Sequence, residues 1–160
     1  MLGQALWELG KPDEAVEPFR AAESAYRTAV RIGPNQTAAL NYLAWFLATC
    51  PDPQFLRPDE AITLAEKALR ILPRASNIWN ALGVARYRSG DIDGCLDAIG
   101  KSMEYSEGGD GMDWYFTAMA RARRGEVEEA RRWFDRASTW TDRHSALDGE
   151  LNRLRDEASA

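Results

Sequence analysis

Small and apolar residues recur along the chain as two kinds of residue pair. The first kind joins neighbours: Leu2-Gly3, Leu43-Ala44, Leu82-Gly83 and Thr117-Ala118. The second kind joins residues four apart: Ala15 and Phe19, Ala61 and Ala65, Cys95 and Ile99, Ala130 and Phe134. Residues four apart share one face of an α-helix, so each unit predicts two helices that pack through these faces. Such units in series predict an all-α chain, a right-handed α-solenoid of four helical hairpins.

The distances between successive units show where residues have been inserted. Leu2, Leu43, Leu82 and Thr117 are separated by 41, 39 and 35 residues, against a period of about 34 for a helix-pair repeat. In the first unit the extra residues lie within 21–32, which has neither glycine nor proline and predicts a longer second helix. In the second unit they lie within 50–58, where three prolines predict an irregular turn.

The motif residues of the third and fourth units resemble those of the tetratricopeptide repeat (TPR). Trp79-x2-Leu82-Gly83 is followed by Gly90 and Cys95, and the fourth unit departs from Leu-Gly with Thr117-Ala118. Further matches are Pro34, Pro73, Trp114, Gly125, Ala130, Phe134 and Ala137, whereas Arg86 stands where the family prefers tyrosine. The first unit resembles the longer variant of kinesin light chains, and residues 43–53 look like bacterial arrays attached to signalling proteins such as Ser/Thr kinases.

The resemblance implies one TPR array over residues 1–158. Its repeats are expected at 1–34, 36–73, 76–107 and 111–140, with a capping helix at 145–158. A TPR helix normally begins well before its Leu-Gly pair, so the first repeat is expected to be N-terminally incomplete, as in a segment cut from a longer array. Ser145-Ala146-Leu147-Asp148 predicts the start of the capping helix, and Leu147, Leu151 and Leu154 predict its apolar stripe.

Composition and charge narrow the classes of partner. The net charge is −5 at pH 7, whereas nucleic-acid binding needs clustered lysine and arginine, so we expect no nucleic-acid partner. No run approaches the roughly 18 apolar residues of a membrane span, so we expect no membrane partner. Cys50 and Cys95 have no CxxC partner and are expected to be reduced thiols in a cytoplasmic protein. The arginines at 121–132 are expected to pair with Glu126, Glu128 and Glu129.

The search for catalytic or metal-binding groups returns little. His144 is the only histidine and has no second histidine or cysteine nearby in sequence, so zinc binding is not expected. Asp91-Ile92-Asp93-Gly94 lacks the later ligands of a calcium loop, and Asp91 is better explained as a helix N-cap. Gly108-Gly109-Asp110-Gly111 lacks the lysine of a phosphate loop and predicts a hinge between repeats. The sequence therefore predicts a protein that is not an enzyme and holds no cofactor.

Surface recognition remains, and the TPR resemblance implies that it uses a concave groove beside the helix-packing positions. Asn41 and Asn80 occupy one motif position in successive repeats, where their amides would bond the backbone of an extended peptide. Trp45 has two open interpretations, as groove surface or as core. The predicted groove residues are Trp7, Asn41, Trp45, Asn80, Val84, Tyr87, Arg88, Tyr115, Met119 and Arg123.

Two functions stay open at this point. The first is a non-catalytic protein-interaction module that binds a peptide or helix of a partner in the groove, as a scaffold segment of a larger bacterial protein. The alternative is a structural module that forms a homodimer through the incomplete first repeat. A chaperone tail is disfavoured as the ligand, because only Arg88 and Arg123 would meet its carboxylates.

Overall fold

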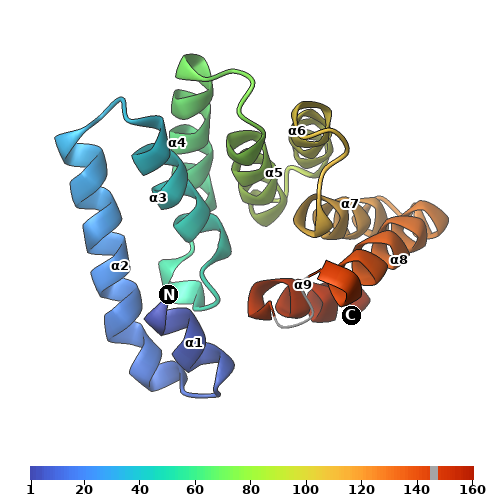
Figure 1. Ribbon diagram of the computed structural model, residues 1–160, viewed down its shortest axis with the longest axis horizontal. Coiled ribbons are helices and arrows are strands. Elements are labelled where there is room, and N and C mark those ends of the chain that lie inside the picture. Colours follow the sequence, from blue (N-terminus) through green and yellow to red (C-terminus); the bar gives the residue numbers. More distant parts are fainter. Residues whose placement is uncertain (145–147) are drawn as a thin grey trace.

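The computed structural model describes residues 1–144 and 148–160, and every regular element in this part of the chain is helical. Figure 1 shows the helices as antiparallel hairpins that follow one another around an arc. They are α1 (Leu2–Glu8), α2 (Pro12–Ile32), α3 (Thr37–Thr49), η1 (Pro53–Phe55, a 3₁₀ turn), α4 (Pro58–Ile71), α5 (Ser76–Ser89), α6 (Ile92–Tyr105), α7 (Gly111–Arg123), α8 (Val127–His144) and α9 (Gly149–Ser159). The prediction of an all-α array of hairpins is confirmed.

The two helices of each hairpin approach closely at the predicted small residues. A Cβ added at Gly83 of α5 would lie 2.5 Å from Ile99 Cδ1 of α6, and one at Gly3 of α1 would lie 2.7 Å from Phe19 Cδ1 of α2. Only glycine fits at such a distance without a shift of the neighbour. Both contacts join residues that the sequence analysis paired, so the predicted register is confirmed in the first and third hairpins.

The predicted insertions also lie where the sequence placed them. Helix α2 has 21 residues, whereas α4 and α6 have 14 each. Between α3 and α4, Asp52 accepts a hydrogen bond from the backbone nitrogen of Gln54 at 3.1 Å and so starts the short turn η1. Asp91 is the N-cap of α6 and accepts from the nitrogen of Gly94 at 2.9 Å, as predicted.

A continuous apolar core runs between the two layers of the arc. Phe19, Phe46 and Phe55 form one aromatic cluster, with ring centroids 5.7–6.4 Å apart. Cys50 and Cys95 are both buried and free. Burial raises the pKa of the Cys50 thiol to about 11 and that of Cys95 to about 12, so neither is a ready nucleophile near neutral pH.

The arginines near the turn from α7 to α8 are largely paired with acidic residues. The Glu126 carboxylate forms ion pairs with Arg121 at 2.5 Å and with Arg124 at 2.9 Å. Arg132 forms an ion pair with Glu129 at 2.7 Å. The prediction of local ion pairs is therefore confirmed for these three arginines. No helix within the described residues is both long and apolar enough to cross a bilayer.

The end of the chain differs in part from the prediction. Helix α9 begins at Gly149, and the Asp148 side chain accepts from the nitrogens of Glu150 and Leu151 at 3.0 and 3.1 Å. Leu151 and Leu154 are buried, as the predicted stripe requires. The predicted role of 145–147 lies outside the described residues.

Candidate functional site

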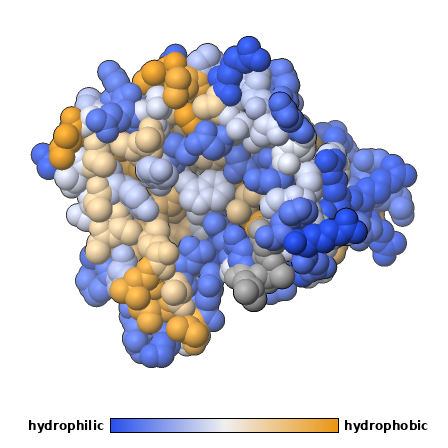
Figure 2. Space-filling view, viewed as in Figure 1, coloured by the Kyte–Doolittle hydropathy of each residue, from blue (hydrophilic) through white to orange (hydrophobic). Residues whose placement is uncertain are grey.

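Helices α1, α3, α5, α7 and α9 line the inside of the arc, while α2, α4, α6 and α8 form its outer layer (Figure 1). A cavity of about 530 Å³ opens between α3, α5 and α7 on this inner side. The space-filling view shows the face hollowed near its middle (Figure 2). The lining residues are Asn41, Tyr42, Trp45, Ser76, Asn77, Asn80, Ser102, Ser106, Gly109, Asp110, Met112 and Asp113. Three consecutive repeats thus contribute to one site.

The polar wall of the cavity is built around the start of α7. Asp110 is the N-cap of this helix, and its side chain and that of Asp113 form a capping box. Asp113 also accepts a hydrogen bond of 2.6 Å from the Asn80 amide nitrogen of α5. Burial raises the pKa of Asp113, although the hydrogen bonds from Asn80 and Ser102 lower it. The capping residues of α7 are therefore also the acidic groups of the site.

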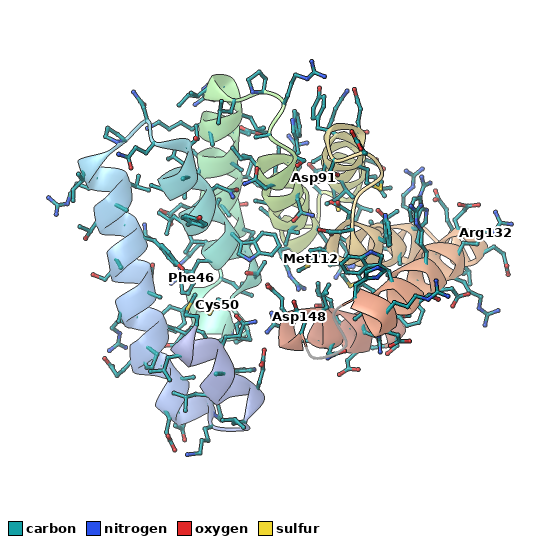
Figure 3. The ribbon with its side chains drawn as sticks, viewed as in Figure 1. Phe46, Cys50, Asp91, Met112, Arg132 and Asp148 are labelled. Carbon is teal, nitrogen blue, oxygen red and sulfur yellow. The ribbon has the colours of Figure 1, made fainter. Side chains whose placement is uncertain are left out.

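The opposite wall belongs to α3. The Oδ1 atom of Asn41 is buried and has no hydrogen-bond partner in the described part of the chain. Trp45 packs partly against the core and also lines the cavity, so each interpretation of this residue holds for part of its side chain. Tyr42 is 60% exposed. Met112 of α7 faces the same central space in the side-chain view (Figure 3).

Helix α9 covers the other half of the inner face. Glu157 forms a two-bond ion pair with Arg88 in the last turn of α5, and its Oε2 accepts from Arg88 Nη2 at 2.8 Å. Arg153 reaches the carbonyl oxygen of Thr49, the last residue of α3, at 3.4 Å. Arg155 Nε donates to the hydroxyl of Tyr115 at 3.1 Å. The open cavity is therefore limited to the middle of α3, the end of α6 and the beginnings of α5 and α7.

The first turn of α9 brings several acidic groups near one another. Burial raises the pKa of Glu150, and the negative charges of Asp148 and Glu8 raise it further. Arg153 and a hydrogen bond from the Trp45 indole lower it. Glu8 belongs to α1, so the two ends of the arc meet at this point.

The structure brings three of the ten predicted groove residues to the cavity: Asn41, Trp45 and Asn80. Val84 and Tyr115 are fully buried, and Tyr87 and Met119 are 5% exposed. Their assignment to the groove wall is corrected here, because adjacent inner helices pack on each other through these positions. Tyr87 contacts Phe116 of the next inner helix with ring centroids 5.5 Å apart.

The remaining three predicted residues have partners within the chain. Trp7 packs near Phe19, with ring centroids 6.3 Å apart. Arg123 lies over the ring of Tyr87 at 4.7 Å from its centroid. Arg88 was expected on the groove surface, but its guanidinium group binds the carboxylate of Glu157 of α9.

The sequence analysis overlooked the acidic wall and Tyr42. The spacing of Asp110 and Asp113 is that of a capping box, which signals the start of a helix. Combined with the predicted hinge just before it, this signal would have placed both carboxylates at the inner end of the fourth repeat. Nothing in the local pattern around Tyr42 distinguishes it from a residue of the packing face.

The hairpins and the inner cavity define a helical-repeat protein with a hollowed concave side. Two segments match family models described as tetratricopeptide repeat, residues 1–49 and residues 114–136. The chain therefore contains tetratricopeptide repeats, and such repeats are generally protein–protein interaction modules without catalytic activity.

Solved structures share the fold. A crystal structure of MamA is 18% identical with a TM-score of 0.64, and the match covers 94% of this chain and 88% of MamA. TTC0263, a thermophilic TPR protein from Thermus thermophilus, is 16% identical with a TM-score of 0.64, covering 99% and 95% of the two chains. The structure titled MamA MSR-1 C2 is 21% identical with a TM-score of 0.56, covering 99% and 75%. The comparison with curated proteins gives no match. None of these similarities links the chain to kinases.

Proposed function

We propose that the protein is a non-catalytic interaction module that binds a polypeptide segment of a partner protein in the inner cavity. The observation that carries the proposal is the convergence of Asn41, Trp45 and Asn80, from two successive inner helices, on one open cavity. A volume of about 530 Å³ lies within the range of roughly 300–1,000 Å³ of ligand pockets in proteins. We include in the proposal a scaffold role within a larger bacterial cytoplasmic protein.

The chemistry of the wall suits a peptide better than a reacting substrate. Amide side chains such as Asn77 and Asn41 can exchange hydrogen bonds with a peptide backbone, which offers one donor and one acceptor per residue. Trp45 and Tyr42 supply aromatic surface, the side-chain type that dominates binding energy in many interfaces. Because α9 covers the last turns of α3 and α5, the segment would lie across the middle of α3 and the beginning of α5.

A displayed library of random peptides, selected on the full-length protein, tests this function. We expect the selected peptides to lose on the order of 10-fold or more in affinity for Tyr42→Ala, since a contacting aromatic residue often contributes that much. Tyr42 is 60% exposed, so its removal should leave the fold intact. Arg132→Ala is the matched control, because Arg132 lies on the outer helix α8 (Figure 3).

One pattern of binding to the two variants would refute the proposal. If the selected peptides bind Tyr42→Ala as tightly as the unaltered protein but weaken with Arg132→Ala, the recognition surface is on the outside and the proposal is wrong. Circular dichroism of both variants shows whether the helices are retained.

Self-association through the first hairpin is the second candidate function. The observation in its favour is the exposed apolar surface of α1 and the turn after it. Leu2 is 66% exposed and Leu9 is 73% exposed, and Figure 2 shows hydrophobic surface over this hairpin. Exposed leucines also occur elsewhere, as at Leu72, so this feature weighs less than the cavity.

A further inference from the structure

The charge of the cavity is one-sided. Asp110 and Asp113 contribute carboxylates, and none of the described residues that line the cavity is lysine or arginine. Asp113 is 3% exposed, so water screens its charge poorly. The chain as a whole carries −5, which also favours the approach of a cation. An anionic group would meet repulsion at this site.

Hydrogen-bond acceptors that are open to a ligand line both walls of the cavity. Asn41 is 8% exposed, and its Oδ1 atom has no donor among the described residues. The Asn80 amide nitrogen is already committed to Asp113. Ser106 donates its hydroxyl hydrogen to the Ser102 carbonyl at 2.7 Å and therefore offers only an acceptor to a ligand. A ligand rich in donors would satisfy these groups, because a buried acceptor without a partner costs free energy.

Aromatic rings complete the surroundings of such a ligand. Trp45 and Tyr42 line the cavity across from α7, and a cation over an aromatic face gains from the negative face of the ring. Trp45 also packs against the core, which restricts its ring. A bound metal ion fits less well, because no cluster of three or more histidine, cysteine or acidic residues suited to a metal occurs within 1–144 and 148–160.

We propose that the cavity receives the cationic end of an arginine or lysine side chain carried by the bound segment. This inference rests on the proposed function and specifies its partner as a basic peptide. The carboxylates of Asp110 and Asp113 would balance the charge, the Asn41 oxygen would accept one of its N–H groups, and the rings of Trp45 and Tyr42 would enclose its apolar stem. Pairing with the cation would also offset the burial that raises the pKa of Asp113.

Two matched peptides test the proposal by NMR titration of the full-length chain. One is acetyl-Gly-Gly-Arg-Gly-Gly-amide, and the other has citrulline, the neutral isostere of arginine, in the central position. We expect the arginine peptide to bind at least about tenfold more tightly, as for hydrogen bonds between charged groups. The largest shifts should appear at the Asn41 side chain and the Trp45 indole.

A double variant, Asp110→Asn with Asp113→Asn, should remove this preference for arginine. Asparagine caps a helix about as well as aspartate, so α7 should be retained. Asp91→Asn is the matched control, because Asp91 caps α6 in the same way but is not among the cavity residues. It should keep the preference.

Three outcomes overturn the inference: equal binding of the two peptides, a preference that survives in the double variant, or shifts confined to the outer helices. The function itself is judged separately by the selected peptides and Tyr42→Ala. Selected peptides that need Tyr42 but show no dependence on basic residues would leave the function standing and refute the basic-peptide assignment.

Discussion

At the residue scale, Glu150 determines how firmly the first turn of α9 is held. Its pKa is raised above the ordinary value of 4.5, first by burial and then by Asp148 and Glu8. The folded state therefore keeps a proton that the unfolded chain releases. As the pH rises from 4.5 through the raised pKa, this group makes the docked helix progressively less stable.

The corresponding prediction concerns Glu150→Gln. Glutamine is neutral and can still accept the hydrogen bond from Trp45, so we expect the amides of α9 to exchange with solvent more slowly at neutral pH than in the unaltered protein. Below pH 4.5 the difference should vanish, because the glutamate is then protonated in both states. Hydrogen exchange followed by mass spectrometry measures this.

Glu157→Gln is the control for the same helix. It removes the charge that pairs with Arg88, so exchange in α9 should become faster. If Glu150→Gln also speeds exchange at neutral pH, the carboxylate is stabilising and the account of Glu150 is wrong.

At the scale of the helices, the close contact between α5 and α6 provides a prediction with an internal control. A Cβ at Gly83 would lie 2.5 Å from Ile99 Cδ1 and 3.2 Å from the Ile99 backbone nitrogen. We expect Gly83→Ala to lower the free energy of unfolding by about 1–3 kcal/mol, the usual cost of overpacking. Urea denaturation followed by circular dichroism measures it.

Gly100 lies next to Ile99 in α6, but an added Cβ there meets nothing within 4 Å. Gly100→Ala should therefore stabilise the protein by about 0.5–1 kcal/mol, because alanine loses less backbone entropy than glycine inside a helix. Equal effects of the two substitutions would mean that the contact with Ile99 does not govern the hairpin.

The packing of the helices could be predicted because it depends on residues that are close in sequence. The site depends on residues that are far apart in sequence, so most of it could not be predicted. Gly83 and Ile99 are 16 residues apart, within one hairpin, so their spacing alone indicates the packing. Arg88 and Glu157 are 69 residues apart, and no periodic pattern indicates that α9 turns back across the inner face. The burial of Val84 and Tyr115 likewise depends on how closely adjacent inner helices approach. The motif did indicate Asn41, Trp45 and Asn80, because equivalent positions in successive repeats point in the same direction.

At the scale of the whole molecule, the oligomeric state separates the two candidate functions. Specific interfaces bury about 800 Å² on each partner, far more than Leu2 and Leu9 provide alone. We therefore expect sedimentation equilibrium to give the monomer mass of 17.9 kDa over a wide range of concentrations. A dimer that Leu2→Ser with Leu9→Ser converts to monomer would support self-association instead.

Helix α9 lies against inner helices from both halves of the chain, with Gly149 beside Glu8 of α1 and Glu157 on Arg88 of α5. An open solenoid of helical repeats can change its pitch when a ligand binds. Here the hydrogen bonds of α9 with Arg88 of α5 and with the Thr49 carbonyl of α3 limit such a change. A segment that binds between α3, α5 and α7 would then meet a cavity whose width changes little, so its binding would require little reordering of the protein.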